Sequence, residues 1–170
     1  IYSTQFSIKQ YYVIRARRDN FLHLTGVRTD LSASEFYSRC LTRNLLEDDF
    51  SICNKQQKGS IKRKLQVIDR ALSFFDSSPF SVEERFKKNK VSCVIATADN
   101  LCTMGFVGTK RCVPMTLLKG NQLKAPLQVD ALLRKPRNAE KFSEIIYINE
   151  DKKDTILAAL AEHVADIFSD

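Results

Sequence analysis

The chain has 170 residues, of which 44% are hydrophobic and 28% charged, a composition that excludes a long disordered tail and fits one globular domain. Lys and Arg number 27 against 20 Asp and Glu, which gives a net charge of +7 and a pI of about 9.2. This excess favours polyanionic partners, nucleic acid above all, because lysine and arginine side chains contact phosphates and release counterions.

Five cysteines lie within apolar runs without any CxxC pair: Cys40, Cys53, Cys93, Cys102 and Cys112. This usage is typical of buried thiols in a reducing compartment, so we expect a cytoplasmic protein without a disulfide framework. The two histidines, His23 and His163, stand far apart in the sequence, and we expect no metal site or other cofactor. No apolar run approaches the length of a membrane span, and no secretory signal is visible.

The chain opens with two β-rich segments, Tyr11–Ala16 and Phe21–Val27, separated by a polar turn. In the second segment His23 and Thr25 alternate with two leucines. If this segment is a strand whose two leucines face the protein core, His23 and Thr25 both lie on the opposite face. That arrangement would line an active site.

Two helices are predicted next. The first begins at Ser32, because Ser32 and Glu35 have the spacing of a capping box and apolar residues follow at helical spacing. The second covers residues 60–75, where Lys64 borders an apolar face and is placed to lean into a cleft; that face comprises Ile61, Leu65, Ile68, Leu72 and Phe75. Between the helices, Phe50–Cys53 has the pattern of a short strand.

The second half of the chain is predicted to be mainly β-structure after a charged connector over Val82–Asn89. A hairpin is expected because Val91–Thr97 and Leu101–Val107 flank the turn Ala98–Asn100, and Gly105 within the second strand predicts a bulge. Two more strands are predicted at Val113–Leu118 and Ser143–Ile148, on either side of a basic stretch, Lys124–Arg137; a final helix covers Lys152–Phe168. The predicted fold class is α+β: one domain spanning residues 1–170, with helices packed on a mostly antiparallel sheet of about four strands and a C-terminal helix.

Several catalytic machineries are excluded by their missing motifs. The sequence has no P-loop or dinucleotide-binding glycine pattern and no GxSxG elbow, and its acidic residues form no two-metal pattern. Metal-independent chemistry with His, Lys, Arg and hydroxyl groups remains, as does binding without catalysis.

Five blocks carry a family resemblance, in this order along the chain: Asn20–Val27, Ser34–Tyr37, Lys62–Leu65, Thr103–Phe106 and Pro114–Lys119. Together they resemble the phage and mobile-element branch of the Barnase–EndoU–Colicin–RelE-like (BECR) nucleases. The resemblance runs from about residue 11 to 148 and leaves out the predicted C-terminal helix. It implies helices preceding an antiparallel sheet, and the activity of RNases that need no metal and often serve as toxins.

The resemblance also implies site residues. Attack of the ribose 2′-OH on the adjacent phosphate would give a 2′,3′-cyclic phosphate, with His23 as general acid or base. Arg15 and Lys64 would neutralise the phosphate oxygens, and Thr116 would hydrogen-bond the phosphate or orient the imidazole. Five residues would contact RNA around this centre: Arg17, Thr25, Lys62, Thr103 and Lys119.

The implied function is therefore an endoribonuclease, the toxin of a toxin–antitoxin or phage-conflict system, restrained by an antitoxin that is either RNA or an acidic protein. Two alternatives stay open. One is a nucleic-acid-binding module without catalysis, and the other is a mobile-element protein that inhibits a host enzyme. The binding module would keep the Lys and Arg residues but would need no reactive His23.

Overall fold

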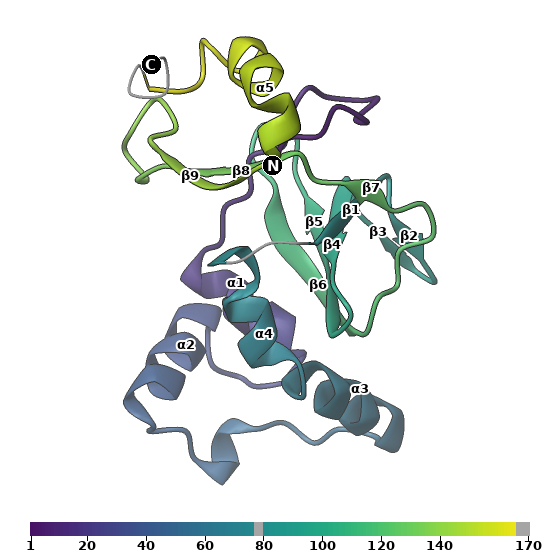
Figure 1. Ribbon diagram of the computed structural model, residues 1–170. Helices are drawn as coiled ribbons and strands as arrows, with labels where there is room; N and C mark the ends of the chain where they lie inside the picture. Colours follow the sequence, from purple (N-terminus) through teal and green to yellow (C-terminus); the bar gives the residue numbers. More distant parts are fainter. Residues whose placement is uncertain (77–79, 166–170) are drawn as a thin grey trace.

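The computed structural model describes residues 1–76 and 80–165 and has the predicted α+β class (Figure 1). Its main sheet is antiparallel, with strand order β6-β5-β4-β1-β7. These strands are β1 (Ser81–Glu84), β4 (Ile95–Ala98), β5 (Cys102–Val107), β6 (Val113–Lys119) and β7 (Leu127–Gln128). Two smaller antiparallel pairs are β2 (Lys87–Lys88) with β3 (Val91–Ser92), and β8 (Ala131–Arg134) with β9 (Glu144–Ile148).

The α-helices are α1 (Arg18–Thr25), α2 (Ala33–Thr42), α3 (Lys55–Leu65), α4 (Ile68–Leu72) and α5 (Lys153–Ala159). Short 3₁₀ turns occupy Glu47–Asp49, Phe74–Asp76 and Glu150–Lys152. In Figure 1, α1 to α4 gather at one end of the molecule, while α5 and the β8–β9 pair lie at the other. The described helices include none long and apolar enough to cross a membrane.

Local sequence signals explain the elements that were predicted correctly. Ser32 Oγ accepts a hydrogen bond from the Glu35 amide at 3.2 Å, and the Glu35 carboxylate accepts one from the Ser32 amide at 3.0 Å, so the capping box at the start of α2 is confirmed. The β4–β5 hairpin is confirmed as well, with Asp99 accepting hydrogen bonds from two amides of its turn.

Gly105 marks the predicted irregularity in β5, where the β5–β6 register shifts between Gly105 and Phe106. A Cβ atom at Gly105 would lie 2.5 Å from Cys93 Sγ and 2.8 Å from Thr116 Cγ2, so only glycine fits there. Since Cys93 belongs to a small cluster with Phe86 and Ala96, this crowded point lies on one face of the sheet.

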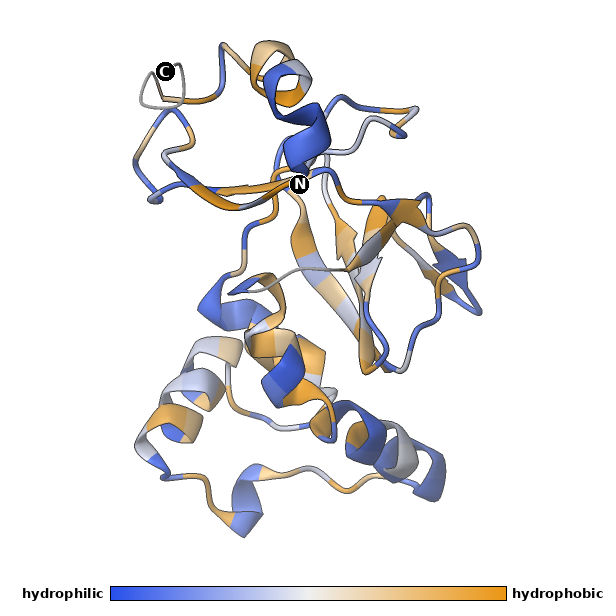
Figure 2. Ribbon diagram, viewed as in Figure 1, coloured by the Kyte–Doolittle hydropathy of each residue, from blue (hydrophilic) through white to orange (hydrophobic). Residues whose placement is uncertain are grey.

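The main core lies on the other face of the sheet. Leu24 of α1, Ala71 of α4 and Phe74 pack there against strand residues that include Ile95, Met104, Phe106 and Leu117. Strands β4 to β6 are accordingly mostly hydrophobic (orange) in Figure 2. Because side chains alternate along a strand, Thr116 points away from this core while its neighbour Leu117 points into it.

The segment Phe21–Val27 was predicted to be a strand, and this prediction is wrong, because α1 covers Arg18–Thr25. Gly26 ends the helix with φ +70°, and its amide donates to the Leu22 carbonyl. Eight residues are too few to distinguish the two periodicities, and packing of Leu24 on the sheet favours the helix. Successive residues point about 100° apart around a helix, so the shared face expected for His23 and Thr25 is lost: His23 is exposed and Thr25 buried.

Other boundaries also differ from prediction. Residues 11–16 form only isolated bridges, 50–53 are not a strand, and the helix expected over 60–75 is two helices that meet at Gln66–Val67. The connector 82–89 holds most of β1 and all of β2, and the basic stretch 124–137 holds β7 and β8. These strands have only two to four residues each, so long-range pairing decides them and local pattern does not. The last helix ends at Ala159, and the predicted part beyond residue 165 lies outside the described residues.

Asp130 anchors the start of β8. Its buried carboxylate accepts hydrogen bonds from the amide and hydroxyl of Thr4 at 2.6 and 2.7 Å, and Lys152 Nζ lies 2.9 Å away. Burial alone would raise the pKa of Asp130, but the bonds from Thr4 and Lys152 outweigh it and lower the pKa. The beginning of the chain, β8 and the turn before α5 are thereby held together.

Candidate functional site

The C-terminal end of α1 brings His23 and Lys64 together. Lys64 Nζ donates to the backbone carbonyl of His23 at 3.3 Å, and its side chain lies against Gly26, where an added Cβ atom would be 3.1 Å from Lys64 Cδ. Burial lowers the pKa of Lys64. A cation next to the last carbonyls of a helix stabilises that helix end, so Lys64 stabilises the end of α1. Its contact with His23 is to the backbone carbonyl and not to the imidazole ring.

The three threonines of the predicted site are all buried. Thr25 Oγ1 donates to the Leu22 carbonyl at 2.7 Å, and Thr103 Oγ1 donates to the Gly120 carbonyl at 2.8 Å. Thr116 is 6% exposed, with its methyl group toward Gly105 on the sheet face that α1 does not cover. The hydroxyls of Thr25 and Thr103 thus already donate to backbone carbonyls of the fold.

The remaining predicted cations lie on the surface. Arg17 precedes α1 and is exposed, as is Lys62 on α3. Lys119, at the end of β6, donates to Gln66 Oε1 at 2.9 Å and so ties the sheet to the end of α3. These side chains are accessible to a large polyanion, but no hydrogen bond joins them to one another in the described part of the chain.

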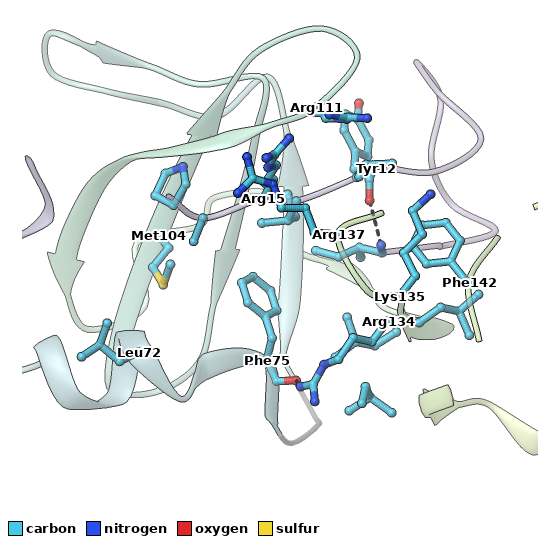
Figure 3. A pocket seen from close by; sticks show the side chains of 18 of the residues that line it. Tyr12, Arg15, Leu72, Phe75, Met104, Arg111, Arg134, Lys135, Arg137 and Phe142 are labelled. Carbon is cyan, nitrogen blue, oxygen red and sulfur yellow. Dashed lines mark hydrogen bonds between the residues drawn. The ribbon is translucent and has the colours of Figure 1, made fainter. Parts of the chain in front are cut away.

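Arg15 lies elsewhere, in a cavity of about 420 Å³ that also contains Arg111 and Arg137 (Figure 3). A parallel bridge between Ile14 and Cys112 places Arg15 beside Arg111, since the Arg15 amide donates to the Cys112 carbonyl at 2.9 Å. Arg137 arrives from the turn that follows β8. Three distant segments of the chain thus bring their guanidinium groups to one place.

These three arginines carry uncompensated charge. Repulsion from Arg137 is the main cause that lowers the pKa of Arg15, followed by desolvation and repulsion from Arg111 and Arg17. Within residues 1–76 and 80–165, none of the three guanidinium groups has a carboxylate or hydrogen-bond partner. Arg134 on the same rim does, since it lies 2.9 Å from Asp76 and 3.6 Å from Glu144. We name Arg15, Arg111 and Arg137 the arginine cluster.

Apolar side chains form the rest of the cavity, among them Leu72, Phe75 and Met104, visible in Figure 3. A concave apolar surface with a few converging polar groups is the usual form of a ligand site. Guanidinium groups bind phosphate oxygens in pairs of hydrogen bonds, so the cavity has the chemistry to hold a phosphate next to a flat apolar group.

Sequence reasoning found Arg15 but missed Arg111 and Arg137. Arg137 belongs to the basic stretch that was noted without a role, and Arg111 follows a glycine turn with no functional signal. At Gly108 the backbone has φ +121°, and an added Cβ atom would lie 2.3 Å from the Arg111 carbonyl oxygen, so glycine is required to direct this turn. No group of three or more His, Cys, Asp or Glu side chains in the described ranges is arranged to hold a metal ion.

Comparison with protein families matches the chain over residues 1–153 to the model described as "phage-Barnase-EndoU-ColicinE5/D-RelE like nuclease4". Comparisons with curated proteins and with solved structures found no match. The matched range is wider than the expected 11–148 and contains the arginine cluster, His23 and Lys64. Since it covers most of the chain, the protein belongs to this family of BECR-type nucleases.

Proposed function

We propose that this nuclease is an endoribonuclease that cleaves RNA without a metal, with the arginine cluster as its phosphate-binding site. The observation that carries the proposal is the gathering of Arg15, Arg111 and Arg137 in one cavity without a counter-charge. Like charges held close together are costly unless an anion joins them, and a phosphodiester supplies that anion.

The proposed reaction is attack of the ribose 2′-oxygen on the adjacent phosphorus. A base takes the proton of the 2′-OH, the bond from phosphorus to the 5′-oxygen breaks, and an acid protonates that leaving oxygen. The products are a 2′,3′-cyclic phosphate and a free 5′-OH. The guanidinium groups would stabilise the charge that develops on the non-bridging phosphate oxygens, and one preorganised donor of this kind is worth roughly 100- to 1,000-fold in enzymes.

His23 is the proposed acid or base. The residue is exposed and its ring makes no hydrogen bond within the described residues, so it is accessible to a substrate. Its neighbour Leu24 lines the cavity. An RNA strand that leaves the arginine cluster across α1 would pass from the Leu24 side to the His23 side of the same helix.

The other predicted residues take supporting roles in this proposal. Lys64 holds the end of α1 that carries His23 and adds positive charge there. The exposed cations Arg17, Lys62 and Lys119 suit flanking phosphates. Thr25, Thr103 and Thr116 are buried and stabilise the fold around the site. The hydroxyls of Thr25 and Thr103 do so by donating to backbone carbonyls.

We further propose that the enzyme acts as a cytoplasmic toxin in conflict between microbes and mobile elements. An RNase that cleaves cellular RNA must be neutralised in its own host. The net charge of +7 suits an antitoxin that is either an RNA or an acidic protein.

The test is incubation of the protein with end-labelled RNA and with DNA of the same sequence, both in EDTA. We expect RNA to be cut to 2′,3′-cyclic phosphate ends and DNA to be spared, because DNA lacks the attacking hydroxyl. His23→Ala should reduce kcat at least about 100-fold. Equal cleavage of DNA, or loss of activity in EDTA that Mg²⁺ restores, would contradict the proposal.

A second candidate, the binding module without catalysis, is favoured by one observation. The described residues that line the arginine cavity include no His, Asp or Glu. RNA binding that His23→Ala leaves unchanged, without any cleavage, would support this reading. If the protein neither binds nor cuts RNA, inhibition of a host enzyme becomes the better hypothesis.

A further inference from the structure

A second concave surface lies between α3 and the segment that precedes it. It is a groove of about 720 Å³ whose lining includes Phe50, Ile52, Ile61 and Leu65. The Ser51 amide donates to the Arg28 carbonyl at 2.9 Å, which holds the outer wall in place. The proposed RNase gives Lys62 of this lining a flanking phosphate but gives the apolar residues of the groove no role.

The groove leaves large apolar side chains uncovered. Ile52 is fully exposed, and Leu65 and Phe50 are 46% and 44% exposed. Single exposed hydrophobic residues are ordinary, but a contiguous group that lines one groove marks an interaction surface. The sequence predicted Leu65 on a buried stripe, yet the folded chain offers nothing to cover it in the described residues.

The rim of the groove is positively charged. Arg28, Lys58 and Lys62 contribute to its lining, and none of them has an ion-pair partner in the part of the chain that the structure describes. Helix α3 as a whole contains five basic and no acidic residues: Lys55, Lys58, Lys62, Arg63 and Lys64. Asp49, in the acidic turn just before the groove, does not pair with these cations, because it already pairs with Arg39 at 2.7 Å.

These features select one kind of occupant. A second copy of the chain would bring the same basic helix to the groove and be repelled. RNA would satisfy the charge but has no aliphatic face for Phe50, Ile52 and Leu65. We propose that the groove binds an acidic amphipathic helix of a protein partner, with apolar side chains in the groove and carboxylates against Arg28, Lys58 and Lys62.

The proposal is tested with three synthetic peptides that share leucines at helical spacing i, i+3 and i+7. Their remaining positions carry Glu in the first peptide, Gln in the second and Lys in the third. A fourth peptide has the composition of the Glu peptide in scrambled order, so its leucines no longer lie on one helix face. Fluorescence anisotropy measures the dissociation constant of each. We expect the Glu peptide to bind at least about tenfold more tightly than the Gln peptide, and the Lys and scrambled peptides to bind least. Equal binding of the Glu and scrambled peptides would overturn the proposal.

Matched variants locate the binding. Ile52→Asp and Lys58→Glu should each weaken the Glu peptide about tenfold or more. Leu41→Asp and Lys55→Glu are the controls, since both residues are exposed and neither lines the groove. If the controls weaken binding as much as the groove variants, the groove is not the site.

Peptide binding does not depend on catalysis, so it can succeed or fail independently of the proposed RNase. Ile52→Asp and Lys58→Glu should leave RNA cleavage unchanged. An oligonucleotide arm separates the classes of ligand: if single-stranded RNA displaces the Glu peptide and Ile52→Asp weakens RNA binding equally, the groove is a nucleic-acid surface and the proposal is wrong.

Discussion

The arginine cluster and the C-terminal end of α1 are both positively charged, but their charges are held differently. At the end of α1, Lys64 meets the His23 carbonyl and lies against Gly26. In the cluster, Arg15 faces Arg137 and Arg111, and no partner compensates it in the described residues. A cation with a partner in the fold stabilises the fold, whereas cations gathered without one remain available to an anionic ligand.

This comparison predicts its largest effect at Arg15. Arg15→Ala should lower kcat/KM for RNA about 100-fold, because it removes a donor to the charge that develops on the non-bridging phosphate oxygens. The melting temperature should not fall, since the substitution also relieves repulsion. Arg63→Ala, an exposed arginine of α3, is the matched control. A fall in stability together with near-normal cleavage would reverse the roles assigned to the two regions.

Gly26→Ala should instead act on stability. The position has φ +70°, and the new methyl group would press on Lys64, so we expect a loss of about 2 kcal/mol of unfolding free energy. Gly59→Ala is the matched control, because Gly59 lies inside α3, an added Cβ atom would make only an ordinary contact with Arg63 Nη1 at 3.6 Å, and alanine favours a helix by roughly 0.5–1 kcal/mol. Denaturant titration measures both. An unchanged Gly26→Ala protein would show that Lys64 is not packed there.

Lys64→Met keeps the aliphatic stem over Gly26 and removes the charge at the helix end. We expect a loss of about 1 kcal/mol of unfolding free energy from the missing hydrogen bond and helix-end interaction. Cleavage should fall less than in Arg15→Ala. Lys62→Met, on the same helix but exposed, should leave stability unchanged in the same titration. A larger loss of cleavage than in Arg15→Ala would place Lys64 at the reacting phosphate.

The smallest expected effect is on salt dependence. Arg137→Ala should reduce the slope of log affinity against log salt for single-stranded RNA by about 0.7, the value for one lost phosphate contact. Arg134→Ala should change the slope less, because Arg134 already pairs with Asp76 and Glu144. Binding measured between 50 and 300 mM salt gives both slopes. Equal slopes for the two variants would mean that internal pairing does not decide which arginines meet RNA.

Local sequence predicted the parts of the fold that depend on neighbouring residues. The Ser32–Glu35 cap and the β4–β5 hairpin each need only a few adjacent side chains, and a glycine within a strand indicates the irregularity at Gly105; all three are present. The strand predicted at Phe21–Val27 was wrong because the alternating pattern of this segment fits either a strand or a short helix. Contact of Leu24 with the sheet decides between the two.

The candidate site was less predictable for the same reason. His23 and Lys64 meet, but only because α3 packs beside α1, and their contact uses a backbone carbonyl that no side-chain pattern reveals. Arg111 and Arg137 carry no motif at all. Thr116 lies on the sheet face that α1 does not cover, and the roles of His23 and Lys64 stay predictions that the variants above test.

By itself the sequence determined the charge, the α+β class and the membership of a nuclease family. Only the tertiary structure decided which cations share a site, through the bridge of Ile14 to Cys112 and the turn after β8. The physical reason is one of range: caps, turns and bulges act over a few residues of chain, whereas electrostatic interactions depend on distance in space, which distant strand pairing sets.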